Sequence, residues 1–168
     1  MKAIILAAGT NSRLNGYIDV PKCLLPLGKS TILENQINAL METGLRKEDI
    51  MVVVGHKYEM IEKVHRNILI NPKFKEFNNG YSVYLALNHL MHGHNLSDDE
   101  KILILDGDLV YDKKLISKIN SLNQENVLVN KPLKYSPELK DETSIVGDEG
   151  KILRMFVPSK QNPLGSEY

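Results

Sequence analysis

Runs of aliphatic and β-branched residues alternate along this chain with segments of helical periodicity, and this alternation constrains the fold more than any other feature. We expect strands at residues 3–6, 50–55, 68–72, 101–110, 126–131 and 142–157, the last range as two strands joined by a turn at Asp148-Glu149-Gly150. We expect helices at residues 31–41, 58–66, 81–91 and 112–122. This order favours an α/β fold with a largely parallel sheet and antiparallel additions near the end.

The segment 31–41 shows the helical signal most clearly. One apolar stripe is expected on it, made by Ile32, Leu33, Ile37, Leu40 and Met41. Gly44 follows at the position where glycine commonly ends a helix.

The overall composition excludes several classes of protein. The 21 basic and 21 acidic residues cancel, so no net field recruits nucleic acid or an anionic membrane. Cys23 is the only cysteine, which excludes an internal disulfide and a cysteine-based zinc site. We expect it to be a small buried thiol beside a loop. No apolar run approaches the length of a membrane-spanning helix, and we expect a cytoplasmic protein.

The length of 168 residues fits one domain spanning residues 1–168. The chain stops directly after a strand-like segment, without a closing helix. This is typical of a domain truncated at its C-terminus.

A small-residue loop follows the first expected strand. Ala7, Ala8 and Gly9 let the backbone approach a ligand closely, and the N–H groups from Gly9 to Asn11 can point at phosphate oxygens. Arg13 can add a charge-assisted contact to the same oxygens. A tight strand-to-helix turn with a solvated arginine is an equally good interpretation of the loop alone.

Two further segments carry charged groups towards the same edge of the sheet. Pro21 stiffens the backbone before Lys22, so its ammonium group is presented from a rigid loop, although a surface lysine between prolines is common. Asp106 and Asp108 close an apolar strand, and Gly107 leaves room for a metal ion between them. Ligands of parallel sheets bind beyond the carboxyl ends of the strands, where the loops GTNSRL and DGDL are both expected to emerge.

The run LAAGTNSRL followed by PKCLLPL resembles the signature of the sugar-nucleotide and phospho-alcohol nucleotidyltransferases. The resemblance continues through TILENQINAL, VVVG, NNGYSVYLAL and LDGD in family order. It implies a Rossmann-like three-layer α/β/α domain of the nucleotide-diphospho-sugar transferase type, with a mostly parallel mixed sheet. Asn11 departs from the family pattern, which has glycine there, but asparagine tolerates a left-handed backbone.

The resemblance also implies roles for individual residues. Arg13 and Lys22 would be catalytic, and Asp108 would bind Mg²⁺ with Asp106 as an alternate ligand. No later aspartate matches the family's second metal ligand; Asp148 is better explained by the hairpin turn. The residues implied to bind the nucleotide are Leu6, Ala7, Ala8, Gly9, Thr10, Asn11, Asn79, Gly80 and Ser82, and those implied to bind the acceptor are Asn78, Tyr81 and Tyr84.

The segment from Asn78 to Tyr84 is similar to the N-x-x-Y-S stretch of choline-phosphate, aminoethylphosphonate and inositol-1-phosphate cytidylyltransferases. Its Ser82 could instead simply be the N-cap of a helix. The resemblance implies Mg²⁺-dependent transfer of a nucleoside monophosphate, with CTP favoured as donor and a phosphate or phosphonate as acceptor. A homodimer is left open.

Two other functions remain compatible with the sequence. The Asp-Gly-Asp run also resembles the aspartate-x-aspartate motif of glycosyltransferases that use nucleotide sugars, and a non-catalytic nucleotide-binding domain would need the same loops. The histidines do not suggest a metal site, and all are expected at the surface: His56, His65, His89, His92 and His94.

Overall fold

The computed structural model describes residues 1–11, 17, 19–93, 96, 100–111, 113–121, 144–148, 151–157 and 166–167. The chain divides into two compact units, Met1–Glu125 and Asn126–Tyr168, which are described separately below.

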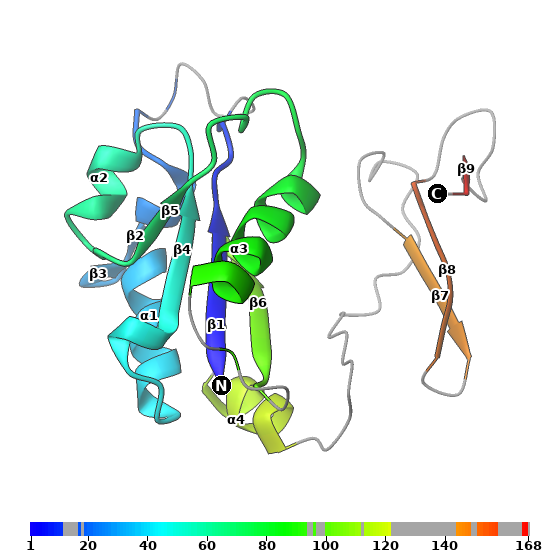
Figure 1. Cartoon of the computed structure of the whole chain (residues 1–168). Coiled ribbons are helices and arrows are strands. Elements are labelled where there is room, and N and C mark those ends of the chain that lie inside the picture. The colour runs from blue at the N-terminus through cyan, green and yellow to red at the C-terminus, as the bar shows by residue number, and fades with distance from the viewer. Residues whose placement is uncertain are drawn as a thin grey trace. The chain divides into compact units, whose positions relative to one another are not determined.

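The first unit is built on a parallel sheet of four strands in the order β5-β4-β1-β6 (Figure 1). These strands are β1 (Lys2–Ala7), β4 (Ile50–Val54), β5 (Ile68–Ile70) and β6 (Ile102–Asp106). The helices are α1 (Ile32–Glu42), α2 (Tyr58–Glu62), α3 (Asn79–Gly93) and α4 (Lys113–Ser121). A short antiparallel ribbon, β2 (Pro26–Leu27) with β3 (Ser30–Thr31), and two 3-10 turns, Lys22–Leu24 and Lys47–Asp49, complete the unit.

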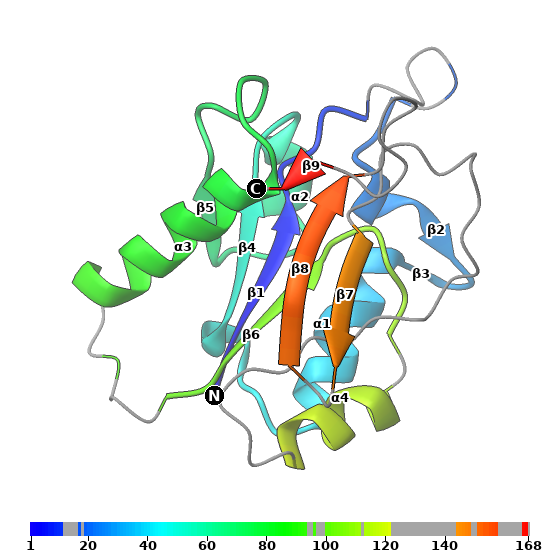
Figure 2. The ribbon, with the colours of Figure 1, turned by 90° about the vertical axis from the view of Figure 1, so that its right-hand side faces the viewer.

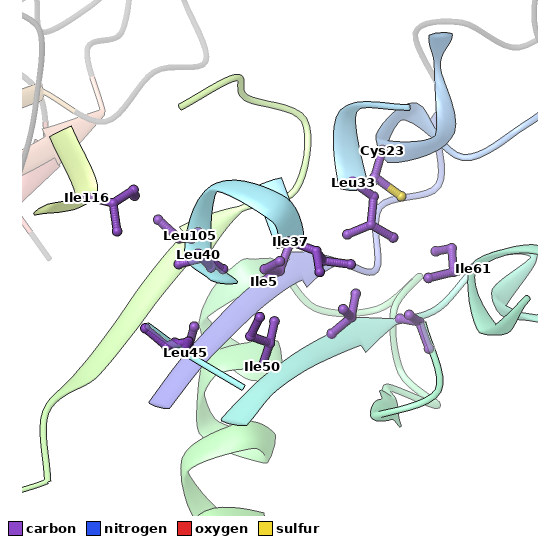
Figure 3. Close-up of a cluster of buried hydrophobic side chains, with 13 residues drawn as sticks. Ile5, Cys23, Leu33, Ile37, Leu40, Leu45, Ile50, Ile61, Leu105 and Ile116 are labelled. Atoms are coloured by element: carbon purple, nitrogen blue, oxygen red, sulfur yellow. The ribbon is translucent and has the colours of Figure 1, made fainter. Parts of the chain in front are cut away.

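The helices cover both faces of this sheet, with α3 on one side and α1 on the other (Figure 2). Successive residues of a strand point to opposite faces. Ile4 and Val53 therefore pack towards Ala86 of α3, whereas Ile5 and Val52 belong to the cluster that includes α1. Figure 3 shows that second cluster, in which residues of α1 and of the sheet are joined by Ile116 of α4 and by Cys23. The predicted α/β architecture with a mostly parallel sheet is confirmed.

Helix α1 lies where its sequence predicts, one residue later at each end than the expected range 31–41. Thr31 Oγ1 accepts a hydrogen bond from the Glu34 amide at 3.2 Å, and Glu34 Oε2 accepts one from the Thr31 amide at 2.7 Å. This reciprocal cap satisfies two backbone donors that a helix start leaves unpaired. Gly44 follows the helix with a φ of +97°. The predicted apolar stripe was wrong at Met41, which is exposed, because the buried face is centred on Leu33, Gln36, Ile37 and Leu40.

Three other predictions need correction. The helix expected at 58–66 stops at Glu62, and the chain then turns so that His65 is buried, with Nε2 2.7 Å from the Ile50 carbonyl. His65 is therefore not a surface residue. Helix α3 starts at Asn79, so Ser82 lies inside it rather than capping it. Strand β6 was expected to be buried, but it lies at one edge of the four-stranded sheet described here, and Ile104 is exposed.

The second unit contains an antiparallel sheet of β7 (Ser144–Asp148), β8 (Lys151–Val157) and β9 (Ser166–Glu167). Asp148 pairs with Lys151, which confirms the predicted hairpin. The strand expected at 126–131 lies outside the described residues.

Within the described part of the chain, no helix has the length and apolar character needed to cross a membrane.

Candidate active site

The end of β1 and the first residue of the loop that follows it lie between two glycines of neighbouring segments. A methyl group built on Gly55 would lie 2.7 Å from the Ala8 carbonyl oxygen, and one built on Gly107 would lie 2.7 Å from the Leu6 carbonyl oxygen. The Gly107 amide donates a hydrogen bond of 2.8 Å to that same Leu6 oxygen. Glycine is therefore required on both sides for the small residues Ala7 and Ala8 to sit this close to the adjacent loops.

Gly9 and Asn11 shape the far end of this loop. Among the described residues, a methyl group built on Gly9 would meet no heavy atom within 4 Å, so one side of the backbone is open towards them. Asn11 has a φ of 57°, the left-handed conformation that the sequence suggested asparagine would adopt in place of glycine. Arg13 lies outside the described residues, so its predicted place beside this loop stays a prediction.

Lys22 opens the 3-10 turn Lys22–Leu24, directly after the buried Pro21. Its Nζ lies 3.7 Å from Oδ2 of Asp108, and the lysine side chain is 32% exposed whereas the aspartate is 48% exposed. The fold thus brings together two charged groups that are far apart in the sequence and that the sequence analysis had placed at one edge of the sheet. Both remain accessible to a ligand.

Asp106 and Asp108 do not alternate along one extended strand, because β6 ends at Asp106 and the next two residues form a turn. Their carboxyl groups still influence each other. Desolvation of Asp106 and the negative charge of Asp108 raise the pKa of Asp106. A cation bound here would stabilise the ionised form of Asp106, which burial and the charge of Asp108 disfavour. Hard carboxylate oxygens are ligands that Mg²⁺ prefers.

The residue types present therefore fit a Mg²⁺ ion that also takes oxygens from a phosphate ligand and from water. Over the described residues, no three His, Cys, Asp or Glu side chains come together as a metal-binding group. An ion bound here would depend on the two aspartates and on its ligand.

Two residues that the sequence analysis missed hold this acidic turn in place. Nε2 of Gln36, a buried residue of α1, donates to the carbonyls of both Asp106, at 2.9 Å, and Leu109. The Tyr111 hydroxyl accepts from the Asp106 amide at 3.0 Å and lies 3.2 Å from the Asp106 carbonyl. Burial, with the nearby carboxylates, raises the pKa of Tyr111 to about 12, so the hydroxyl keeps its proton. A polar residue in the middle of an apolar helical stripe was the available signal for Gln36.

The start of α3 lies beside the acidic turn. Asn79 Nδ2 donates to Asp106 Oδ1 at 3.4 Å, and the Asn78 side chain accepts from the Gly80 amide at 3.0 Å, as a helix cap does. Asn78, Asn79 and Gly80 are all exposed. The sequence analysis assigned Asn79 and Gly80 to the nucleotide and Asn78 to the acceptor, and the hydrogen bond from Asn79 puts this segment next to Asp106.

Aromatic residues continue along the exposed side of α3. The rings of Phe77 and Tyr81 are stacked with centroids 4.9 Å apart, and the ring of Tyr84 lies 6.0 Å from that of Tyr81. Lys73 Nζ lies 5.5 Å from the Phe77 centroid and 5.9 Å from that of Tyr81. An exposed aromatic surface of this kind can pack against the apolar part of a small substrate.

Ser82 lies beneath this surface rather than on it. The side chain is buried, and its hydroxyl accepts a hydrogen bond of 3.0 Å from Asn71, which is also buried. The backbone amide of Asn71 in turn donates to the Val54 carbonyl at the end of β4. Ser82 therefore ties α3 to the sheet through Asn71.

Cys23 is buried, as expected, next to the catalytic candidate Lys22. Burial raises the pKa of its thiol to about 12. A thiol that keeps its proton is a weak nucleophile, so Cys23 is not a candidate nucleophile at this edge.

The sequence and the fold of this chain are similar to those of known proteins. Residues 3–132 match the family model described as a MobA-like NTP transferase domain. The chain is 36% identical over 104 residues to the choline-phosphate cytidylyltransferase of Streptococcus pneumoniae, an alignment that covers 59% of this chain and 44% of that protein. It is 32% identical over 127 residues to the bifunctional protein GlmU of Methanococcus aeolicus, covering 71% of this chain and 28% of that one. The chain thus spans less than half the length of these curated relatives.

Solved structures show the same fold. The inositol-1-phosphate CTP transferase of T. maritima matches with a TM-score of 0.64 at 21% identity, covering 92% of this chain and 62% of that one. The CTP:phosphocholine cytidylyltransferase of Streptococcus pneumoniae matches with a TM-score of 0.50 at 30% identity, covering 64% and 44% of the two chains.

Proposed function

Because this chain belongs to the family of MobA-like NTP transferase domains, we propose that it transfers CMP from CTP to a small phosphate or phosphonate acceptor and releases pyrophosphate. The observation that carries the proposal is the meeting of Lys22 and Asp108 beyond the carboxyl ends of β1 and β6. A cation and a carboxylate at the open edge of a parallel sheet are the groups that a triphosphate with its metal ion would engage.

The loop after β1 would hold the triphosphate. Backbone N–H groups from Gly9 to Asn11 would donate to phosphate oxygens, with Leu6, Ala7, Ala8 and Thr10 forming the walls of this cradle. Lys22 and Arg13 would stabilise the negative charge that develops on the transferring group. The open side of Gly9 supports this assignment, because no heavy atom of the described residues lies within 4 Å of a Cβ built there.

The acceptor needs no general base, because a phosphate or phosphonate oxygen is already anionic at neutral pH. The new bond forms between that oxygen and the α-phosphorus, and the bond to the bridging oxygen of pyrophosphate breaks. What the protein supplies is in-line positioning and neutralisation of charge.

Asp108, with Asp106 beside it, would hold Mg²⁺. When bound, the ion neutralises phosphate charge and orients the reacting groups. Gln36 and Tyr111 would keep the Asp106-Gly107-Asp108 turn in the conformation that presents these carboxylates.

We assign the nucleoside to the start of α3 and the acceptor to its aromatic side. Asn79 and Gly80 would contact the nucleotide, with Ser82 supporting them from beneath. Asn78, Tyr81 and Tyr84 would line the acceptor site. The preference for CTP is supported by the similarity to a choline-phosphate cytidylyltransferase and by the Asn78–Ser82 segment.

The experiment that tests this proposal is a matrix of four nucleoside triphosphates against phosphocholine, aminoethylphosphonate, inositol 1-phosphate and glucose 1-phosphate, with Mg²⁺. We expect pyrophosphate release with CTP and one of the first three acceptors. In a parallel incubation with nucleotide sugars in place of the triphosphates, release of a nucleoside diphosphate would instead identify a glycosyltransferase. Nucleotide binding without release of pyrophosphate in any combination would identify a binding domain and overturn the proposal.

A further inference from the structure

Asn11 occupies a backbone conformation that glycine would adopt more easily. Its φ is 57°, which asparagine tolerates at some energetic cost and most other residues avoid. The family pattern that the sequence resembles has glycine at this position. The side chain of Asn11 therefore has to be considered for what it contributes beyond the turn itself.

Both polar atoms of the Asn11 side chain bind one distant segment. Nδ2 donates to the Val20 carbonyl at 2.7 Å, and Oδ1 accepts from the Lys22 amide at 3.3 Å. The two bonds lie on either side of Pro21, which has no amide hydrogen of its own. The asparagine side chain thus pairs with the backbone around the proline much as a neighbouring strand would.

The Lys22 amide is a donor that its own secondary structure leaves unpaired. Lys22 is the first residue of a 3-10 turn, and the first amides of such a turn have no partner within it. Asn11 supplies the missing acceptor. From this fixed backbone the lysine side chain extends until its Nζ lies 3.7 Å from Asp108.

We propose that Asn11 is a positioning residue, whose side chain locks the Lys22 backbone to the turn after β1. The residue that shapes the phosphate-binding turn thereby also fixes the origin of the cation. This inference rests on the proposed function for the role of Lys22, but the lock itself is a property of the protein without ligand.

Hydrogen exchange in the absence of nucleotide tests the lock. Asn11→Gly keeps the left-handed turn and removes both side-chain bonds, so the Lys22 amide is expected to exchange at least about tenfold faster than in the parent. Pro21 contributes no amide, which helps to resolve the signal of Lys22. The matched control is Asn67→Gly. Asn67 makes two similar bonds, to the carbonyls of Glu48 and Ile50, at the opposite edge of the sheet. Its loss should leave Lys22 exchange unchanged.

A double-mutant cycle tests the catalytic consequence. Asn11→Gly should lower kcat roughly ten- to a hundredfold, since misplacing a catalytic group by about an ångström has effects of this size. In a Lys22→Ala background the same change should lower kcat less than about twofold, because the group being positioned is gone. Asn67→Gly should leave kcat unchanged in each background, at the parental value with Lys22 present and at the Lys22→Ala value without it.

Unchanged Lys22 exchange in Asn11→Gly would overturn the proposal, and so would equal losses of kcat in the two backgrounds. If the parent protein transfers no nucleotide at all, the proposed function fails, while faster exchange in Asn11→Gly would still support the lock.

Discussion

Gly107 is the residue at which a single methyl group should disturb both stability and catalysis. A Cβ at this position would lie 2.7 Å from the Leu6 carbonyl oxygen, 3.1 Å from Ala7 Cβ and 3.2 Å from the Leu6 carbonyl carbon. The nearest atom belongs to the backbone of the central strand β1 and cannot rotate away. Either the acidic turn or the end of β1 must therefore move in Gly107→Ala.

The expected magnitudes follow from that contact. Overpacking a tight site costs about 1–3 kcal/mol, and we expect the free energy of unfolding in urea to fall by that amount. Because Asp106 and Asp108 flank Gly107, a shift of the turn by about 1 Å should lower kcat roughly a hundredfold. Both quantities are measured on the same preparation, by urea titration and by pyrophosphate release at saturating Mg²⁺.

Gly9→Ala is the matched comparison. A Cβ there meets no heavy atom of the described residues within 4 Å, so the unfolding free energy of Gly9→Ala should equal that of the parent within about 0.5 kcal/mol. Nucleotide affinity should nevertheless fall, because the methyl group occupies space assigned to the phosphates. Parental stability and kcat in Gly107→Ala would refute the contact argument, and parental affinity in Gly9→Ala would remove Gly9 from the phosphate site.

The remaining predictions concern charges, the base and the thiol. Lys22→Ala should unfold like the parent within about 0.5 kcal/mol yet lose about a hundredfold or more in kcat; near-parental kcat would make Lys22 an ordinary surface residue. Asp108→Asn should keep the fold by circular dichroism and abolish Mg²⁺-dependent turnover, and parental pyrophosphate release at saturating Mg²⁺ would refute the metal assignment. With Mg²⁺, CTP should raise the Tm more than UTP, ATP or GTP, whereas a larger shift with a purine nucleotide would reject the choice of base. Cys23 should react with a thiol reagent only as fast as the protein unfolds. Burial raises the pKa of its thiol to about 12 in the folded protein, above the value of about 8.5 in the unfolded chain. The contribution of the thiol to stability should therefore be lost as the pH rises from about 8.5 towards 12. Rapid labelling of the native protein would contradict its burial.

Most of the scaffold could be predicted from the sequence because local signals and tertiary packing agree there. The aliphatic run of β4 is buried at every residue, and the cap at Thr31 and the glycine after α1 delimit that helix. The signals failed where a polar side chain is buried through a partner distant in sequence. His65 and Gln36 are examples. Each is buried with its side chain hydrogen-bonded to the backbone carbonyl of a strand residue, and only the folded sheet brings that carbonyl into reach.

Individual residues of the candidate site could be predicted from the sequence, but the hydrogen bonds that join its segments could not. Loop composition and strand ends pointed to Gly9, Lys22 and Asp108, and the fold brings the latter two together. The bonds from Asn11 to the segment around Pro21 could not be foreseen, because they depend on loop geometry that no periodic pattern encodes. The same holds for the hydrogen bonds of Tyr111 to Asp106.

Nucleotidyl transfer from CTP requires attack at the α-phosphorus, and an isotope label shows which phosphorus atom reacts. The protein is incubated with Mg²⁺ and the acceptor found in the matrix, once with CTP labelled at the α-phosphate and once with CTP labelled at the γ-phosphate. Nucleotidyl transfer predicts that the α-label appears in the acceptor product and the γ-label in pyrophosphate. Label from the γ-position in the acceptor, or in inorganic phosphate with none in pyrophosphate, would contradict the account.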